Sequence, residues 1–199
     1  MSIQEKLSTY LRNIWNNNEL FLHYFTVLFF FSLMGGFLLY PSMPQKADEF
    51  VNEAFSGIFV PNSSFQTFRN IVARNVGATC ITLILGLSIF APTLIVTING
   101  LLVGLVIHSG LGRGTLTLHQ LFFGIAPHAI FELPAFLLSA SLGTRIGFAL
   151  LSHGNLVEKF TILYVRLREG IITYIILILP LLIIAAWIEA YITSALILG

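Results

Sequence analysis

The chain has 199 residues, of which 56% are hydrophobic and only 10% are charged, and its formal net charge is +1. Soluble domains carry about 25% charged residues, so this composition excludes an ordinary soluble enzyme, a secreted disulfide scaffold and a disordered tail. Nucleic-acid binding is excluded as well, because 10 Lys and Arg against 9 Asp and Glu leave no basic excess to neutralise phosphates. We therefore expect an integral membrane protein surrounded by lipid, with no nucleic-acid partner.

Apolar runs of about 20 residues, the length needed to cross a bilayer, predict five membrane spans. The expected fold class is all-α: a polytopic helical protein with one membrane domain, residues 1–199, and short interfacial amphipathic helices. The predicted spans are 20–40, 71–90, 92–108, 121–142 and 171–190. A turn at Phe90-Ala91-Pro92 is expected between the second and third spans, and a glycine-rich loop, Ser109–Thr117, follows the third.

Residues 1–19 predict an interfacial helix, because their apolar side chains recur at helical spacing beside polar ones. These apolar residues are Ile3, Leu7, Leu11 and Ile14. The segments 48–58 and 156–168 repeat the pattern.

Lys and Arg in the loops predict the orientation of the chain. With five spans, one side holds Lys6, Arg12, Arg145, Lys159, Arg166 and Arg168, and the other holds Lys46, Arg69, Arg74 and Arg113. The excess places the N-terminus in the cytoplasm and the C-terminus outside the cell membrane. Trp187 and Tyr191 then lie near the outer interface, where we expect Glu189 to reach water.

The fourth span contains the most informative polar residues, His128 and Glu132. They are four residues apart, so they share one face of a helix, and an ionisable group at that depth must face protein or water. Pro127 and Pro134 bracket the pair and each leaves a carbonyl without its helical partner. Such broken helices often line transporter binding sites, although they are also common as passive kinks.

Three roles for Glu132 remain open: a hydrogen-bonded packing group, a member of a proton or substrate path with His128, and a metal ligand. His128 and Glu132 are competent zinc ligands, but two ligands do not complete a site. No cofactor is otherwise expected. The histidines His23, His108, His119 and His153 fall near span ends and are expected at the interface.

Small and polar residues on the second and third spans predict close helix packing. Gly100 and Gly104 form a small-x-x-x-small pair, and Asn99 needs hydrogen-bond partners that an apolar span offers only through another helix. We predict that Asn75, Asn99, His128 and Glu132 converge inside the bundle.

Three blocks in order resemble the stage II sporulation protein M family. They are Arg74-Asn75-Val76, then Asn99-Gly100 with Gly104, then Pro127-His128 with Glu132-Leu133-Pro134-Ala135; Gly143 and Gly147 also match. The resemblance covers about residues 68–195. The chain departs from the family where it has Arg74 in place of asparagine, which puts a cation beside the site, and where it has Ala129 in place of glycine.

The resemblance implies a membrane anchor or scaffold, since the founding member works with cell-wall hydrolases. Our leading hypothesis is therefore a non-catalytic component, a homodimer, that anchors or regulates envelope partner proteins. The first alternative is a transporter or channel-like protein with Glu132 and His128 at the midplane. The second is an intramembrane metal-dependent hydrolase, in which a glutamate activates water beside a metal-bound histidine.

Overall fold

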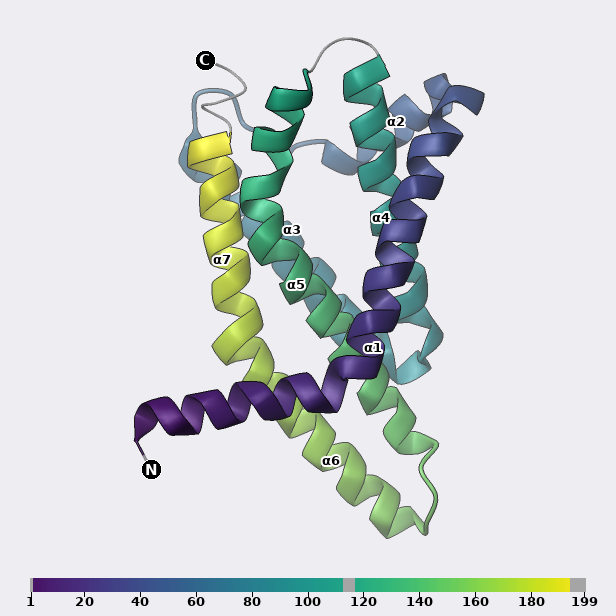
Figure 1. Ribbon diagram of the computed structural model, residues 1–199, viewed down its shortest axis with the longest axis vertical. Helices are drawn as coiled ribbons and strands as arrows, with labels where there is room; N and C mark the ends of the chain where they lie inside the picture. Colours follow the sequence, from purple (N-terminus) through teal and green to yellow (C-terminus); the bar gives the residue numbers. More distant parts are fainter. Residues whose placement is uncertain (1, 113–116, 194–199) are drawn as a thin grey trace.

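The computed structural model describes residues 2–112 and 117–193. Every regular element in these ranges is helical (Figure 1). The α-helices are α1 (Ile3–Leu39), α2 (Pro44–Phe55), α3 (Ser64–Leu85), α4 (Phe90–Gly112), α5 (Leu118–Leu150), α6 (Leu156–Thr173) and α7 (Leu179–Trp187). Five stretches are long and apolar enough to span a membrane: Gln4–Ser42, Ser64–Ser88, Phe90–Gly112, Leu118–Leu150 and Leu156–Thr193. The predicted all-α fold with five spans is confirmed.

The predicted interfacial helix and the first span form one continuous helix, α1, which begins with a capping box between Ser2 and Glu5. Figure 1 shows the first part of α1 lying across the bundle, above the connection between α5 and α6 in this view, and the rest running along the bundle. We call the crossing part, Ile3–Asn18, the N-terminal arm. Leu7, Leu11 and Trp15 on the arm are exposed, as a helix lying on a membrane surface requires.

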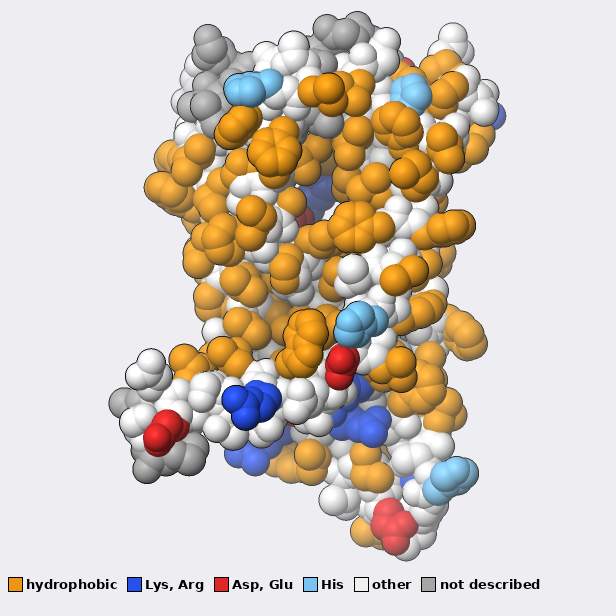
Figure 2. Space-filling view, viewed as in Figure 1, with side chains coloured by type: hydrophobic (Ala, Val, Ile, Leu, Met, Phe, Trp, Pro, Cys, Tyr) orange, Lys and Arg blue, Asp and Glu red, His pale blue; other side chains and the backbone are white. Residues whose placement is uncertain are grey.

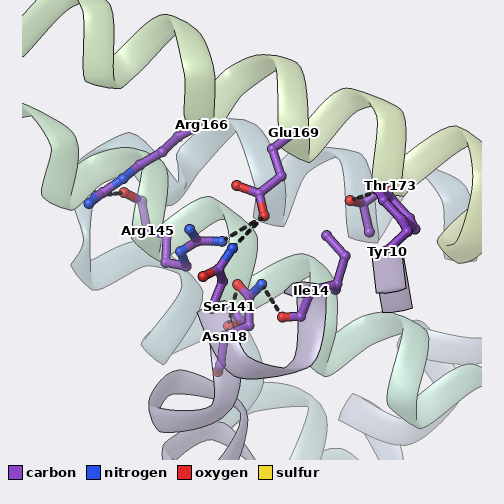
Figure 3. Close-up of polar contacts among 9 residues, drawn as sticks. Tyr10, Ile14, Asn18, Ser141, Arg145, Arg166, Glu169 and Thr173 are labelled. Atoms are coloured by element: carbon purple, nitrogen blue, oxygen red, sulfur yellow. Dashed lines mark hydrogen bonds and ion pairs between the residues drawn. The ribbon is translucent and has the colours of Figure 1, made fainter. Parts of the chain in front are cut away.

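Hydrogen bonds fix the arm against α5 and α6 (Figure 3). The Asn18 side chain is fully buried; its Nδ2 donates to the Ile14 carbonyl at 2.8 Å, and Ser141 Oγ donates to its Oδ1 at 3.1 Å. Tyr10 and Thr173 share a hydroxyl hydrogen bond of 2.8 Å. The two helices that hold the arm are themselves joined by an ion pair of 3.3 Å between the Arg145 guanidinium on α5 and Glu169 on α6. The direction of the arm is therefore fixed by polar contacts with two other helices.

Glycines allow α1 and α4 to approach closely. A Cβ on Gly100 would collide with the Phe29 carbonyl and Ser32, and a Cβ on Gly104 would collide with the Leu33 carbonyl. A second close approach joins α3 to α5, where Gly86 lies against Gly143 and Gly147. The small-residue faces noted in the sequence thus pack within one chain.

The predicted turn at residues 90–92 is wrong by a few residues. The chain reverses through a 3-10 turn at Gly86–Ser88 and through Ile89, whose φ of 62° lies in the left-handed region. Pro92 instead lies in the first turn of α4, where its missing N–H is tolerated. In α5 the helix continues through both Pro127 and Pro134. Residues 113–116 of the glycine-rich loop, including Arg113, lie outside the described residues.

Candidate functional site

A cavity of about 910 Å³ lies in the half of the bundle that contains the end of α7. Its walls come from α1 to α5, from α7 and from the helical turn that follows α7. Six of its polar lining residues are Arg74, Asn75, Asn99, His128, Glu132 and Glu189. Figure 2 shows a hollow in the upper part of the molecule, with blue and red side-chain atoms inside an otherwise orange surface. The scarce charges of the membrane region are thus collected in one place.

Two polar residues of the cavity come from one face of α5. His128 and Glu132 both line it, as their i, i+4 spacing requires. Asn75 on α3 and Asn99 on α4 line the same cavity. The four residues predicted to converge therefore do lie around one space, and their role stays a prediction.

The side-chain amide of Asn99 has a hydrogen-bond partner other than the one we expected. Its Nδ2 donates to the carbonyl of Ile95, one turn earlier on its own helix, at 2.9 Å. The prediction that only another helix could supply a partner for this amide is wrong, because a side chain on a helix can reach back to the i−4 carbonyl. The Asn99 amide therefore does not need a second helix for this bond.

Glu189 is the site residue that the sequence reading missed. We expected it in water, yet it lines the cavity, and ligand atoms of His128, Glu132 and Glu189 lie within 4.8 Å of one another. Its neighbours Trp187 and Tyr191 are 51% and 40% exposed. Since successive helical residues are about 100° apart, a residue two positions from an outward-facing Trp187 points inward. This two-residue spacing is the sequence feature from which the inward orientation of Glu189 could have been predicted.

The backbone around Glu189 is also unusual. Residues Ile188–Thr193 form a π-helical turn, a rare conformation that is often found at functional sites because it redirects side chains. A second π-helical stretch, Tyr174–Ile178, precedes Pro180, which lacks the N–H for a normal helical bond.

Arg74 provides the positive charge of the cavity. Its guanidinium carbon lies 4.6 Å from the centroid of the Phe55 ring, a cation–π contact. It interacts electrostatically with the carboxyl groups of both Glu132 and Glu189. The sequence counted Arg74 among the charges that set the orientation and also predicted a cation beside the site; the structure places it on the cavity wall. Asn75, the next residue, hydrogen-bonds through its side chain to Glu132.

One ring nitrogen of His128 makes no hydrogen bond to the described residues. This atom, Nδ1, is buried. A buried polar atom without a partner costs about 1–3 kcal/mol of folding free energy. A ligand that bound this nitrogen would remove that cost. Such a nitrogen can accept a proton or bind a metal ion.

In the other half of the bundle, buried apolar side chains of the described helices pack against one another. One buried cluster there includes Leu138, Leu142 and Ile178, and a second includes Phe25 and Val96. On α5, the cavity residues occupy the first half of the helix and these core residues the second. The cavity is thus bounded by a close-packed core at its inner end.

One comparison with known proteins identifies the family. The family model described as stage II sporulation protein M matches residues 25–194. The searches of curated proteins and of solved structures each found nothing that matches. Because the match extends over most of the chain, this integral membrane protein belongs to the stage II sporulation protein M family.

Proposed function

We propose that this protein is a non-catalytic scaffold of the cell membrane, which anchors or regulates a partner membrane protein through its cavity. The observation that carries the proposal is a cavity with apolar walls and a polar interior that is open on the side of the bundle. A partner's transmembrane helix that carries one polar side chain would match this cavity. Its apolar side chains would pack on the apolar walls, and its polar side chain would hydrogen-bond to the polar interior.

The rim of the cavity supports a partner that arrives through lipid. Ile130 and Phe30 line the cavity and are also 67% and 53% exposed. Side chains in this position face the hydrocarbon region, so the cavity is accessible from within the bilayer. A water-soluble ligand would have to pass these side chains.

The orientation belongs to the same proposal, with the N-terminus in the cytoplasm. Because Arg74 lies in the cavity, the loop charges of the opposite side fall to Lys46, Arg69 and Arg113, against six on the side of the N-terminal arm. The positive-inside rule then favours a cytoplasmic arm more strongly than the sequence count did.

A homodimer stays a prediction with less support. The glycine faces that suggested it pack within the chain, Gly100 and Gly104 against α1 and Gly86 against α5. A dimer would therefore need another surface.

The transporter alternative is supported less than the scaffold. A transport path must continue to the other face of the membrane, whereas the cavity ends at a close-packed cluster that includes Leu142 and Ile178. The polar residues of the cavity suit binding without translocation.

Site-specific photocrosslinking tests the scaffold proposal. A photoreactive amino acid at Ile130, on the rim, is expected to give an adduct with another membrane protein when the chain is expressed in its own host. The matched control is Ile84 on α3, which is 65% exposed but does not line the cavity. Mass spectrometry identifies the adducts. Lipid adducts alone, or the same protein adduct at both positions, would contradict the proposal, and an adduct with a second copy would assign the rim to a dimer contact instead.

A further inference from the structure

We propose that His128, Glu132 and Glu189 together bind one divalent transition-metal ion, with zinc as the best match. The ion binds through one imidazole nitrogen and two carboxylate oxygens, a donor set that zinc accepts. The inference does not depend on the scaffold role, because a metal site can stabilise a bundle of any function.

The distances fit such a site before any ion is bound. The three ligand atoms lie within 4.8 Å of one another. In a tetrahedral zinc site with bonds of about 2.0–2.1 Å, ligand atoms are roughly 3.4 Å apart. The difference is small enough for side-chain rotation to close, without a movement of helices.

The backbone arrangement directs three metal-ligating side chains toward one position. His128 and Glu132 are one turn apart on α5, and Glu189 faces them from the π-helical turn that follows α7. The ligand set therefore joins two helices across the cavity. A fourth position remains for water or for a group brought by a ligand of the cavity, as in zinc sites with three protein ligands.

Two observations separate this site from a simple packing cluster. First, the buried Nδ1 of His128 has no partner among the described residues, so the imidazole is not held by a protein hydrogen bond at that atom. Second, the Asn75 side chain hydrogen-bonds to Glu132, which is the kind of outer contact that orients a metal ligand.

The formal charges of the cavity lining are also compatible with a bound cation. Among the described residues that line the cavity, Glu132 and Glu189 carry two formal negative charges and Arg74 carries one positive charge. Arg74 opposes a metal ion, but its guanidinium is stacked on Phe55 at 4.6 Å. A divalent ion would reduce the cost of keeping two carboxylates in a membrane interior.

The test uses the full-length protein in detergent, stripped with a chelator and then titrated with Zn²⁺ alone. Calorimetry and elemental analysis after gel filtration are expected to give one tightly bound ion per chain. Glu189→Gln and His128→Gln should each weaken binding by at least tenfold. The matched controls, Glu53→Gln and His119→Gln, change exposed residues outside the trio and should leave the affinity unchanged.

A spectroscopic readout keeps the proposal testable if a variant fails to fold. Zinc X-ray absorption of the unmodified protein should show one imidazole and otherwise oxygen ligands. Binding without an imidazole ligand, binding that His128→Gln and His119→Gln weaken equally, or no stoichiometric binding would each overturn the proposal. Because crosslinking at Ile130 does not require zinc, failure of the metal site and failure of the scaffold role are distinguishable.

Discussion

Replacing Gly104 with alanine is expected to lower the stability of the bundle substantially. A Cβ at this position would overlap the Leu33 carbonyl and the Phe37 amide nitrogen of α1. Because the obstacle is backbone rather than a flexible side chain, α1 and α4 must move apart to accommodate one methyl group. Overpacking of this kind costs about 1–3 kcal/mol, and more where backbone must shift. Thermal unfolding in detergent, followed by circular dichroism, measures the loss.

Gly77 provides the matched control for this experiment. It also lies within a spanning helix, α3, but a Cβ there would meet nothing within 4 Å. Gly77→Ala should therefore leave stability unchanged or raise it by about 0.5–1 kcal/mol, because alanine favours the helix. Equal midpoints for Gly104→Ala and Gly77→Ala would show that α1 and α4 are not in close contact.

Replacing Arg74 with leucine should have the second large effect. The guanidinium interacts with both Glu132 and Glu189, so its removal leaves two carboxyl groups without the cation that faces them. Leaving polar or charged groups without a partner in a membrane interior is costly, and we expect a loss of about 1–3 kcal/mol. Unfolding measured at neutral pH should show this loss in Arg74→Leu and a smaller loss in Arg74→Lys, which keeps the charge.

A double variant distinguishes the electrostatic effect from lost packing on Phe55. Adding Glu132→Gln to Arg74→Leu removes one of the stranded charges, so it should restore part of the stability. If the two substitutions instead add without coupling, Arg74 stabilises the helices through its contact with the Phe55 ring alone.

Much of the fold follows from the sequence because lipid imposes a simple rule. Each span must be apolar over its full width, so runs such as 20–40 and 171–190 are recognisable from composition. Where the chain leaves lipid, the rule weakens. The arm and the first span form one helix, and at their junction the buried Asn18 side chain accepts a hydrogen bond from Ser141 of α5, a tertiary contact that no local pattern contains.

The candidate site could be predicted only in part for a related reason. His128 and Glu132 stand out because they share a helical face within an apolar run. Glu189 lies close to the end of its span, where an acid ordinarily reaches water. Its helical phase relative to Trp187 is the one sequence feature that could have indicated an inward-facing side chain. Arg74 was expected beside the site, but its contact with the Phe55 ring of α2 joins two segments that are far apart in sequence, so no local pattern contains it.

The polar residues of α5 and of the turn after α7 face each other across one cavity. Paired substitutions Glu132→Cys and Glu189→Cys, in a Cys80→Ser background that removes the single natural cysteine, test it directly. A short bifunctional thiol reagent should link the two positions within one chain, as identified by mass spectrometry of the joined peptides. The pair Glu132→Cys and Trp187→Cys, in which the second residue is exposed, should not link. Linkage through Trp187→Cys but not through Glu189→Cys would show that Glu189 does not face Glu132 across the cavity.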